Sequence, residues 1–309
     1  MRLATIITPD GPRLHVKTRD GGYADLGHAY PGDPAYAGLG SFLTAGSSAM
    51  EAARQLETSA EGRHYEPADF APAVPEPPRI LCLGLNYSEH ALEGGRNVPT
   101  WPDTFVRGSE TVLGPYAELV RPALTASFDY EGELGIVIGT GGRYIPASKA
   151  IDAIAGFTVL NDASARDWQR AATQWTPGKN FDGSMPIGPE IVTPDEVDVS
   201  DVELITTLNG QVMQHARTSQ MLVDVPSTVE FFSSFTTLRP GDVIATGTPG
   251  GVGFARKPPV WLQPGDVIEV SIAGVGTIRN RVVAETLSAG QAAPAEWRWR
   301  PGVTTISRL

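Results

Sequence analysis

The chain has 309 residues, a formal net charge of −11 and a hydrophobic content of 41%. This length allows a sizeable core and predicts two domains, or one large domain with an appendage. The acidic balance argues against nucleic acid and against an anionic membrane surface as the main partner. The single cysteine, Cys82, excludes an intrachain disulfide framework and a cysteine-based zinc site. No run of 18 apolar residues and no signal-like N-terminal segment occurs, so we expect a soluble protein of the cytoplasm.

The first 75 residues predict a small N-terminal α+β domain. Two β-prone runs, Arg2–Thr8 and Arg13–Lys17, flank a Pro-Asp-Gly-Pro turn, and Ser47–Gln55 predicts a helix capped by one of its first two serines. Five prolines between residues 66 and 78 disfavour regular structure there. We therefore place a domain boundary near residue 75. The second domain covers residues 76–309, with a C-terminal surface tail from about residue 288.

Among the five histidines, His90 lies in a segment with recognisable chemistry, NYSEHALEGG over residues 86–95. His90 and Glu93 are three residues apart, so on a helical turn they share one face. A carboxylate that fixes the tautomer of a histidine is a common way to build a general base, although a surface pair is the plainer alternative. The glycines and prolines that follow favour a mobile lid. His15 and His28 have no reactive neighbours, and we expect both on the surface.

Three acids in two apolar runs predict a metal site. The run Phe128–Gly139 reads as one strand, on which Glu131 and Glu133 point to the same face. Two neighbouring acids on a half-buried strand repel each other, and a divalent cation is the simplest compensation. A solvent-facing edge strand is the alternative interpretation. Asp162 follows the apolar run Ile154–Leu160 and is either a helix cap or the third ligand of an all-oxygen site.

Further polar residues lie downstream of this site. Ser164 predicts the cap of a helix on which Arg166 and Gln169 face the same pocket. Lys179 is expected in a loop, where lysines are usually solvated. The glycine-rich stretch over residues 246–251 leaves backbone N–H groups that could bind a carboxylate. It lacks the lysine of a phosphate-binding loop and the spacing of a dinucleotide-binding motif, which argues against nucleotide binding.

The C-terminal half predicts short strands. Glu203–Leu208 and Gln211–His215 flank Asn209-Gly210, a strong hairpin signal, and Ser227–Leu238 predicts a helix capped by Ser227. A Leu-x-Pro-Gly-Asp-Val-Ile phrase occurs twice, each time as a turn that leads into a strand. With 34 glycines and 26 prolines, the chain favours turns and strands over long helices. The predicted fold class is therefore α+β and rich in strands.

Five motifs in order resemble the fumarylacetoacetate hydrolase family over about residues 79–284. They are Asn-Tyr-x-x-His-Ala-x-Glu, Asp-Tyr-Glu-Gly-Glu-Leu, Asn-Asp-x-Ser-Ala-Arg-Asp-x-Gln, Gly-Lys-x-Phe-Asp and Thr-Gly-Thr-Pro-x-Gly-Val-Gly. The resemblance implies a mixed β-roll catalytic domain, a small N-terminal domain, a homodimer and a bound Mg²⁺, Mn²⁺ or Ca²⁺ ion. It also implies roles for individual residues. These are Glu131, Glu133 and Asp162 as metal ligands, His90 and Glu93 as an acid–base dyad on a lid, Lys179 as the active-site lysine, Arg166 and Gln169 as pocket residues, and Thr248 as a contact of the substrate's carboxylate end.

One departure narrows the resemblance. The animal fumarylacetoacetate hydrolases carry a further aspartate ligand shortly before the catalytic histidine, whereas here Leu83 lies seven residues before His90. The chain thus resembles the shorter three-carboxylate branch, which includes acylpyruvate hydrolases, diene-dioate isomerases and decarboxylases. We also expect Arg107, Trp101 and Gln174 near the pocket.

The predicted function is metal-dependent hydrolysis of a carbon–carbon bond in an acylpyruvate-like or other 1,3-dicarbonyl oxo-acid, in the catabolism of aromatic or related compounds. His90, oriented by Glu93, would activate a water molecule, and Lys179 would stabilise the enolate that leaves. One alternative is decarboxylation or isomerisation of a 2-oxo or 2-hydroxydienoic diacid on the same metal site. A second alternative is a metal-binding protein without catalytic activity.

Overall fold

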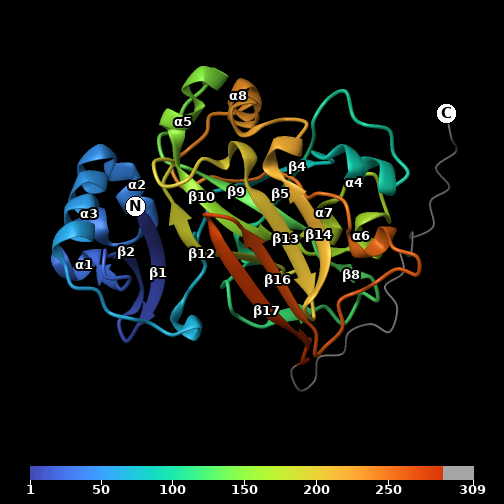
Figure 1. Cartoon of the computed structure of the whole chain (residues 1–309), viewed down its shortest axis with the longest axis horizontal. Coiled ribbons are helices and arrows are strands. Elements are labelled where there is room, and N and C mark those ends of the chain that lie inside the picture. Colours follow the sequence, from blue (N-terminus) through green and yellow to red (C-terminus); the bar gives the residue numbers. More distant parts are fainter. Residues whose placement is uncertain (288–309) are drawn as a thin grey trace, which may run out of the picture.

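Two β-sheets carry the fold of this computed structural model, which describes residues 1–287 (Figure 1). The predicted tail from about residue 288 lies outside the described residues. The larger sheet has ten strands in the order β3-β2-β1-β12-β10-β9-β15-β4-β5, and β6 pairs with β12. In that order its strands are β3 (Tyr23–Asp25), β2 (Gly11–Lys17), β1 (Arg2–Thr8), β12 (Met185–Val192), β10 (Ile154–Asn161), β9 (Gly132–Ile138), β15 (Val243–Ala245), β4 (Ile80–Gly84), β5 (Asp103–Arg107) and β6 (Val112–Leu113).

The second sheet has five strands and packs across the middle of the first. Its order is β14 (Gln211–Arg217), β13 (Glu203–Leu208), β16 (Val267–Ile272), β17 (Gly276–Ala284) and β7 (Leu119–Arg121). Side chains of β9 and β10 pack against those of β13 and β16, as Leu134 and Phe157 do in one cluster with Leu204 and Val270. Each such fully buried side chain contributes about 1.5–3 kcal/mol to stability. A separate pair, β8 (Phe128–Asp129) and β11 (Ser164–Ala165), lies near the site described below.

The helices are short and gather at different ends of the molecule. In Figure 1, α1, α2 and α3 lie beside β1 and β2, whereas α4, α6 and α7 lie at the opposite end. Their bounds are α1 (Leu26–Ala29), α2 (Leu39–Ala45), α3 (Ser47–Ser59), α4 (Ser88–Glu93), α5 (Ala150–Ala153), α6 (Arg166–Gln169), α7 (Thr176–Lys179) and α8 (Val225–Phe235), with 3₁₀ turns at Pro34–Tyr36, Pro67–Asp69, Ser109–Thr111, Ala147–Lys149, Val199–Asp201, Thr218–Gln220 and Gly253–Ala255. Within residues 1–287, we find no helix with the length and apolar character needed to cross a membrane.

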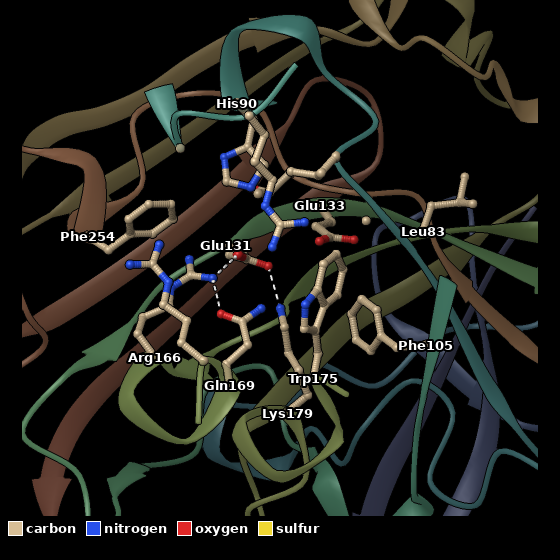
Figure 2. Close-up of a pocket in the computed structure, with 16 residues that line it drawn as sticks. Leu83, His90, Phe105, Glu131, Glu133, Arg166, Gln169, Trp175, Lys179 and Phe254 are labelled. Carbon is tan, nitrogen blue, oxygen red and sulfur yellow. Dashed lines mark hydrogen bonds and ion pairs between the residues drawn. The ribbon is translucent and has the colours of Figure 1, made fainter. Parts of the chain in front are cut away.

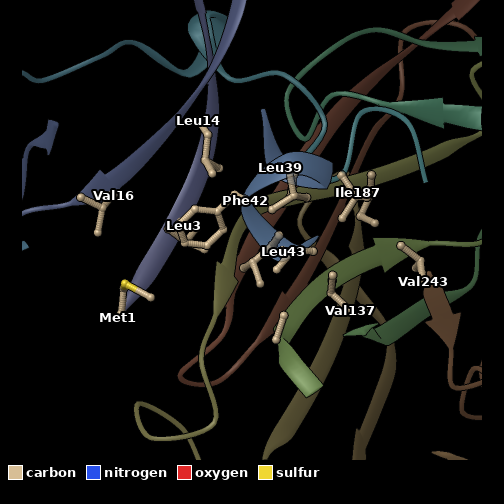
Figure 3. Packing of buried hydrophobic residues seen from close by; sticks show 14 of the residues in the cluster. Met1, Leu3, Leu14, Val16, Leu39, Phe42, Leu43, Val137, Ile187 and Val243 are labelled. Carbon is tan, nitrogen blue, oxygen red and sulfur yellow. The ribbon is translucent and has the colours of Figure 1, made fainter. Parts of the chain in front are cut away.

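The N-terminal region continues the large sheet. β1 pairs with β2 on one side and antiparallel with β12 on the other. Figure 3 shows the core that results, in which Leu3 and Phe42 belong to the same buried cluster as Ile187 and Val243. The polypeptide between residues 66 and 78 contains one 3₁₀ turn and otherwise no helix or strand, in keeping with its prolines. The domain boundary near residue 75 stays a prediction.

The predicted hairpin is present. Asn209 and Gly210 join β13 to β14 with φ values of 52° and 80°. Two adjacent residues with positive φ form the tight turn whose twist suits antiparallel strands. Together with the two sheets and the short helices, this hairpin confirms the strand-rich α+β class predicted from the sequence.

Three local predictions were wrong. The run 128–139 is two strands, because the N–H of Glu131 donates to the Asn161 side chain (2.9 Å) in the gap between β8 and β9. The cap of α8 is Asp224, whose carboxylate accepts the N–H of Ser227 at 2.8 Å. His15 is fully buried and not on the surface, since its ring lies between the Arg13 carbonyl (3.0 Å) and a tyrosine hydroxyl.

Two smaller expectations also fail. α3 begins at Ser47, but the residue before it, Gly46, occupies the cap position, so no serine side chain caps this helix. Ser164 does not cap α6 either, because it lies in β11 and its hydroxyl donates to the Asp162 carbonyl at 3.0 Å. In both places a neighbouring strand or glycine turn, rather than a side-chain cap, sets where the helix starts.

Candidate metal centre and active site

Three carboxylates meet where β9 begins and β10 ends. These strands are antiparallel neighbours with Gly132 opposite Asn161, so the residues just before β9 lie beside those just after β10. The N–H of Asp162 donates to the Glu131 carbonyl at 2.8 Å, which ties the two chain segments together. Glu131, Glu133 and Asp162 are thereby brought into one group, which we call the acid triad.

The acid triad has the composition of a site for a hard divalent cation. Each side chain offers one carboxylate oxygen, and the three oxygens lie within 4.8 Å of one another. All three residues are buried. Burial, together with the Asp162 and Glu131 carboxylates beside it, raises the pKa of Glu133 well above its usual value. A cation relieves such repulsion, and Mg²⁺, Mn²⁺ and Ca²⁺ take oxygen ligands, so these residues fit the ion that the sequence predicts.

Cationic side chains balance two members of the triad. Lys179 is the last residue of α7 and buried, not in a solvated loop, and its ammonium donates to Glu131 Oε2 and Asp162 Oδ2, both at 2.6 Å. Arg166 lies 2.7 Å from the other Glu131 oxygen, and Arg107 forms an ion pair with Asp162. Burial alone would raise the pKa of Glu131, but the Arg166 and Lys179 charges hold it far below its usual value. The third triad member has no cationic partner among residues 1–287.

His90 and Glu93 share one face of α4, as their spacing predicts. Nδ1 of His90 lies 2.8 Å from Glu93 Oε1, and the ring meets Phe254 edge-on. His90 is buried and lines the cavity, where Figure 2 shows it facing Glu131 and Glu133. Within the described part of the chain, its Nε2 has no hydrogen-bond partner. A carboxylate that accepts from Nδ1 leaves Nε2 as the atom that exchanges a proton.

In the glycine-rich loop over residues 246–254, backbone N–H groups donate hydrogen bonds to acidic side chains of the protein itself. They donate to Glu133 (from Gly247, 2.7 Å), to Glu93 (from Gly251, 2.8 Å) and to Asp129 (from Gly253, 2.8 Å). Thr248 lines the cavity, but its hydroxyl donates to the Gly132 carbonyl (2.9 Å) and accepts from Gln214 (2.7 Å). The loop thus orients three carboxylates of the site, which the sequence pattern did not reveal.

α6 and α7 hold the cationic side of the cavity. Arg166 donates from Nε to Asp129 (2.8 Å) and from Nη1 to Gln169 (3.0 Å), while its buried Nη2 has no partner among the described residues. A Cβ at Gly178 would lie 2.4 Å from the Gln169 backbone nitrogen. Only glycine therefore lets α7 approach α6 closely enough for Lys179 and Arg166 to reach the same carboxylate.

The cavity above the triad has a volume of ≈ 260 Å³. Trp101 and Gln174 do not line it, contrary to expectation, and Arg107 lies behind it as the partner of Asp162. The neighbouring Trp175 lines it instead. Sequence reasoning also missed Phe105, Phe254, Arg96 and Arg170, which come from four separate segments. The full lining is Leu83, Gly84, Leu85, His90, Gly94, Arg96, Phe105, Glu131, Glu133, Arg166, Gln169, Arg170, Trp175, Lys179, Thr248 and Phe254.

Comparison with known proteins agrees with this geometry. Residues 79–283 match the family model described as fumarylacetoacetate (FAA) hydrolase C-terminal. The chain belongs to this family. The matched residues contain the acid triad, the His90–Glu93 pair and the glycine-rich loop.

Relatives in the fumarylacetoacetate hydrolase family have several activities. The chain is 39% identical over 290 residues to the mitochondrial oxaloacetate tautomerase FAHD2A of Bos taurus, covering 92% of each chain. It is similar to the 5-carboxymethyl-2-hydroxymuconate delta-isomerase of Mycobacterium smegmatis (TM-score 0.71, 35% identity, 93% of this chain and 100% of that one). It is also similar to the maleylpyruvate hydrolase of Sphingobium sp. SYK-6 in complex with manganese(II) and pyruvate (TM-score 0.74, 28% identity, 93% and 100% coverage). The family and its triad support an enzyme with a divalent metal ion.

Proposed function

We propose that this protein is a metal-dependent tautomerase of a short 2-oxo dicarboxylic acid, of the class to which oxaloacetate belongs. The observation that carries the proposal is the His90–Glu93 pair, whose free Nε2 faces the acid triad across one cavity. A keto–enol exchange needs one positioned base and a way to stabilise charge on the neighbouring oxygen, and both are present. Similarity over nearly the whole length to an oxaloacetate tautomerase supports the same class.

The protein's own residues supply the proton transfer. In enol formation, Nε2 of His90 takes a proton from the carbon beside the ketone, the C–H electron pair becomes the new C=C bond, and the C=O π pair moves onto the ketone oxygen. That oxygen then takes up the proton from Nε2, which restores the neutral imidazole. Ketone formation is the reverse. Glu93 holds the imidazole through Nδ1 and stabilises its charged form, and the Gly251 N–H fixes Glu93 in turn at 2.8 Å. Arg166 lines the cavity, where Asp129 and Gln169 hold its side chain, so its positive charge would attract a substrate carboxylate.

Glu131, Glu133 and Asp162 would hold the divalent ion, which when bound supplies a Lewis acid for the oxygens of a 2-oxo acid. Lys179 bridges two of these carboxylates, so we propose that it keeps them ionised and in place. A cavity of ≈ 260 Å³ lies just below the roughly 300–1,000 Å³ of sites for drug-sized ligands. Its size suits a small acid.

The test is a ketonisation assay with controlled metal content. Protein stripped with a chelator and reloaded with Mg²⁺ or Mn²⁺ should accelerate the loss of enol absorbance of freshly dissolved oxaloacetate, without release of pyruvate. His90→Ala should remove the acceleration, and His28→Ala, at an exposed histidine, should not. If the metal-loaded protein leaves the ketonisation rate at its spontaneous value, the tautomerase proposal is wrong.

Hydrolysis of a carbon–carbon bond, the first prediction from the sequence, is the second candidate. The same Nε2 that removes a carbon-bound proton could instead activate water, and the maleylpyruvate hydrolase gives this option a structural precedent. Release of pyruvate from an acylpyruvate would favour it. Release of CO₂ from oxaloacetate would favour the decarboxylase alternative, and metal binding without turnover of any of these acids would favour the non-catalytic one.

Assembly, compartment and pathway stay predictions. A homodimer is testable by light scattering of the purified chain. A cytoplasmic location is testable by microscopy of a tagged copy, and the bovine relative differs in being mitochondrial. A role in aromatic catabolism depends on the substrate that the assays identify.

A further inference from the structure

Two arginines at the mouth of the cavity form no ion pair with an acid among residues 1–287. Arg96 follows α4 on the predicted lid, and Arg170 is the residue directly after α6. Both line the cavity and are exposed. Neither guanidinium forms an ion pair or a side-chain hydrogen bond with any residue from 1 to 287. Two segments that are far apart in the sequence therefore bring unpaired positive charge to one opening.

Aromatic rings hold these guanidiniums toward the cavity. Arg96 lies 5.4 Å from the ring centroid of Trp175, and Arg170 lies 4.1 Å from that of Phe254. Such cation–π contacts orient a guanidinium without using its N–H groups. At Gly84, a Cβ would lie 2.3 Å from the Trp175 ring, so this glycine makes room for the ring that supports Arg96. The N–H groups of both arginines stay available for a ligand.

The positive charges at the mouth repel one another. Burial, and then the charges of Arg166 and Arg96, lower the pKa of Arg170. Arg166 differs because Asp129 and Glu131 compensate it, at 2.8 Å and 2.7 Å. Like charges that converge without compensation are stabilised by a bound anion.

We propose that Arg96 and Arg170 form a second anion subsite, which receives the distal carboxylate of a dicarboxylic substrate. The head of the substrate, a 2-oxo acid, would lie at the acid triad, and this part rests on the proposed function. The subsite makes the enzyme selective for dianions over monoanions of the same length. Because Arg96 is on the lid segment, a bound distal carboxylate also links that segment to α6.

The test measures binding of two unreactive acids that differ only at the distal end. L-malate and L-2-hydroxybutyrate share a four-carbon 2-hydroxy acid, but malate carries a carboxylate where 2-hydroxybutyrate has a methyl group. Calorimetric titration of Mn²⁺-loaded protein should give at least about tenfold tighter binding of malate, as a charge-assisted hydrogen bond predicts. Equal affinity for the two acids would overturn the subsite.

Variants assign the preference to the two arginines. R96Q and R170Q should each weaken malate binding by about 10- to 100-fold and leave 2-hydroxybutyrate binding unchanged, while R170K should keep part of the preference through its charge. R281Q, at an exposed arginine outside the cavity, is the matched control. Equal weakening of both acids would mean a general loss of site structure and would contradict the proposal.

The outcome is independent of the ketonisation assay. A malate preference that depends on Arg96 and Arg170 in a protein without tautomerase activity would keep the subsite and remove the proposed function. Tautomerase activity with no difference between the two acids would keep the function and remove the subsite.

Discussion

Two buried groups of charged residues in this molecule are built in opposite ways. Glu190, on β12, accepts from the Tyr23 hydroxyl (2.5 Å), Arg2 (2.8 Å) and Lys17 (3.0 Å). Burial alone would raise its pKa, but the Tyr23 and Arg2 hydrogen bonds and the Lys17 charge hold the pKa of Glu190 below its usual value. The group joins the N-terminal strands β1, β2 and β3 to β12 within the large sheet. We call it the Glu190 cluster.

In the acid triad, by contrast, one buried carboxylate has no cationic partner within the described chain. Glu133 accepts one backbone N–H, from Gly247, forms no ion pair among residues 1–287, and lies beside the carboxylates of Asp162 and Glu131. Its raised pKa is the consequence. A buried acid that is fully paired stabilises the fold, whereas one that lacks a partner indicates a place for a cation or a substrate. A raised pKa thus marks Glu133 as a buried acid without a cationic partner among the residues that the structure describes. A lowered pKa alone does not mark a structural acid, because, despite burial, Arg166 and Lys179 also lower the pKa of Glu131 in the triad.

The largest expected effect comes from Glu133→Gln. The neutral amide is a weaker ligand than the carboxylate, so Mn²⁺ affinity and turnover should both fall, turnover by at least about 10²-fold, because a metal supplies several kcal/mol of transition-state stabilisation. In chelator, the melting temperature should stay equal or rise, since a neutral amide removes repulsion inside the triad. Calorimetry with Mn²⁺ and thermal melts measure these two quantities. Wild-type Mn²⁺ affinity in this variant would refute the ligand assignment.

Two buried histidines allow the same comparison between a residue of the site and a residue that stabilises the fold. His90→Ala should lower turnover by about 10²–10⁴-fold, the usual contribution of a general base, with little change in stability. His15→Ala should do the reverse, with activity retained and a loss of about 1–3 kcal/mol in the free energy of unfolding. The reason is that its ring is bonded to the Arg13 carbonyl and the Tyr65 hydroxyl. If His90→Ala retains full turnover, the base assignment fails.

Glu190→Gln tests the Glu190 cluster directly. The change leaves Arg2 and Lys17 without their shared carboxylate, so the free energy of unfolding should fall by about 1–3 kcal/mol. Turnover and Mn²⁺ binding should remain at wild-type values, because Glu190 does not line the cavity. Urea unfolding monitored by tryptophan fluorescence measures the first quantity. A loss of metal binding without a loss of stability would remove the distinction between the two clusters.

The sequence predicted those parts of the site that lie within short motifs. His90 and Glu93 are one helical turn apart, and Glu131, Glu133 and Asp162 lie at the ends of strands that pair with each other, so spacing and apolar runs indicated them as candidates. The order of the motifs, which resembles the fumarylacetoacetate hydrolase family, was needed to prefer a site over a surface pair, an edge strand or a helix cap. The sequence could not predict tertiary contacts between residues that lie far apart in the chain. Arg96 and Arg170 resemble ordinary solvated arginines until residues 84, 175 and 254 are placed beside them.

The errors have the same cause. The spacing of two between Glu131 and Glu133 indicates one strand, but the Asn161 side chain takes the Glu131 N–H and interrupts the ladder. His15 looked like a surface residue because its partner Tyr65 is 50 residues away. Asp129 adjoins the predicted acids, yet only the folded chain shows that it fixes Arg166 and accepts N–H groups of the glycine-rich loop. Tertiary contacts overrode local pattern at each of these positions.

The smallest expected effect is the pH dependence of the Glu190 cluster. A carboxylate whose pKa is lower in the folded chain than in the unfolded one contributes stability above its unfolded pKa of about 4.3, and the contribution is lost as the pH falls through the folded value. The difference in the free energy of unfolding between wild type and Glu190→Gln should therefore be constant from about pH 7 to pH 5 and shrink below about pH 4.3. Working in chelator keeps metal release out of the measurement, and comparing the two proteins cancels the titration of the distant triad. A difference that stays constant down to pH 3 would show that hydrogen-bond geometry, and not the charge on Glu190, holds the N-terminal strands to the sheet.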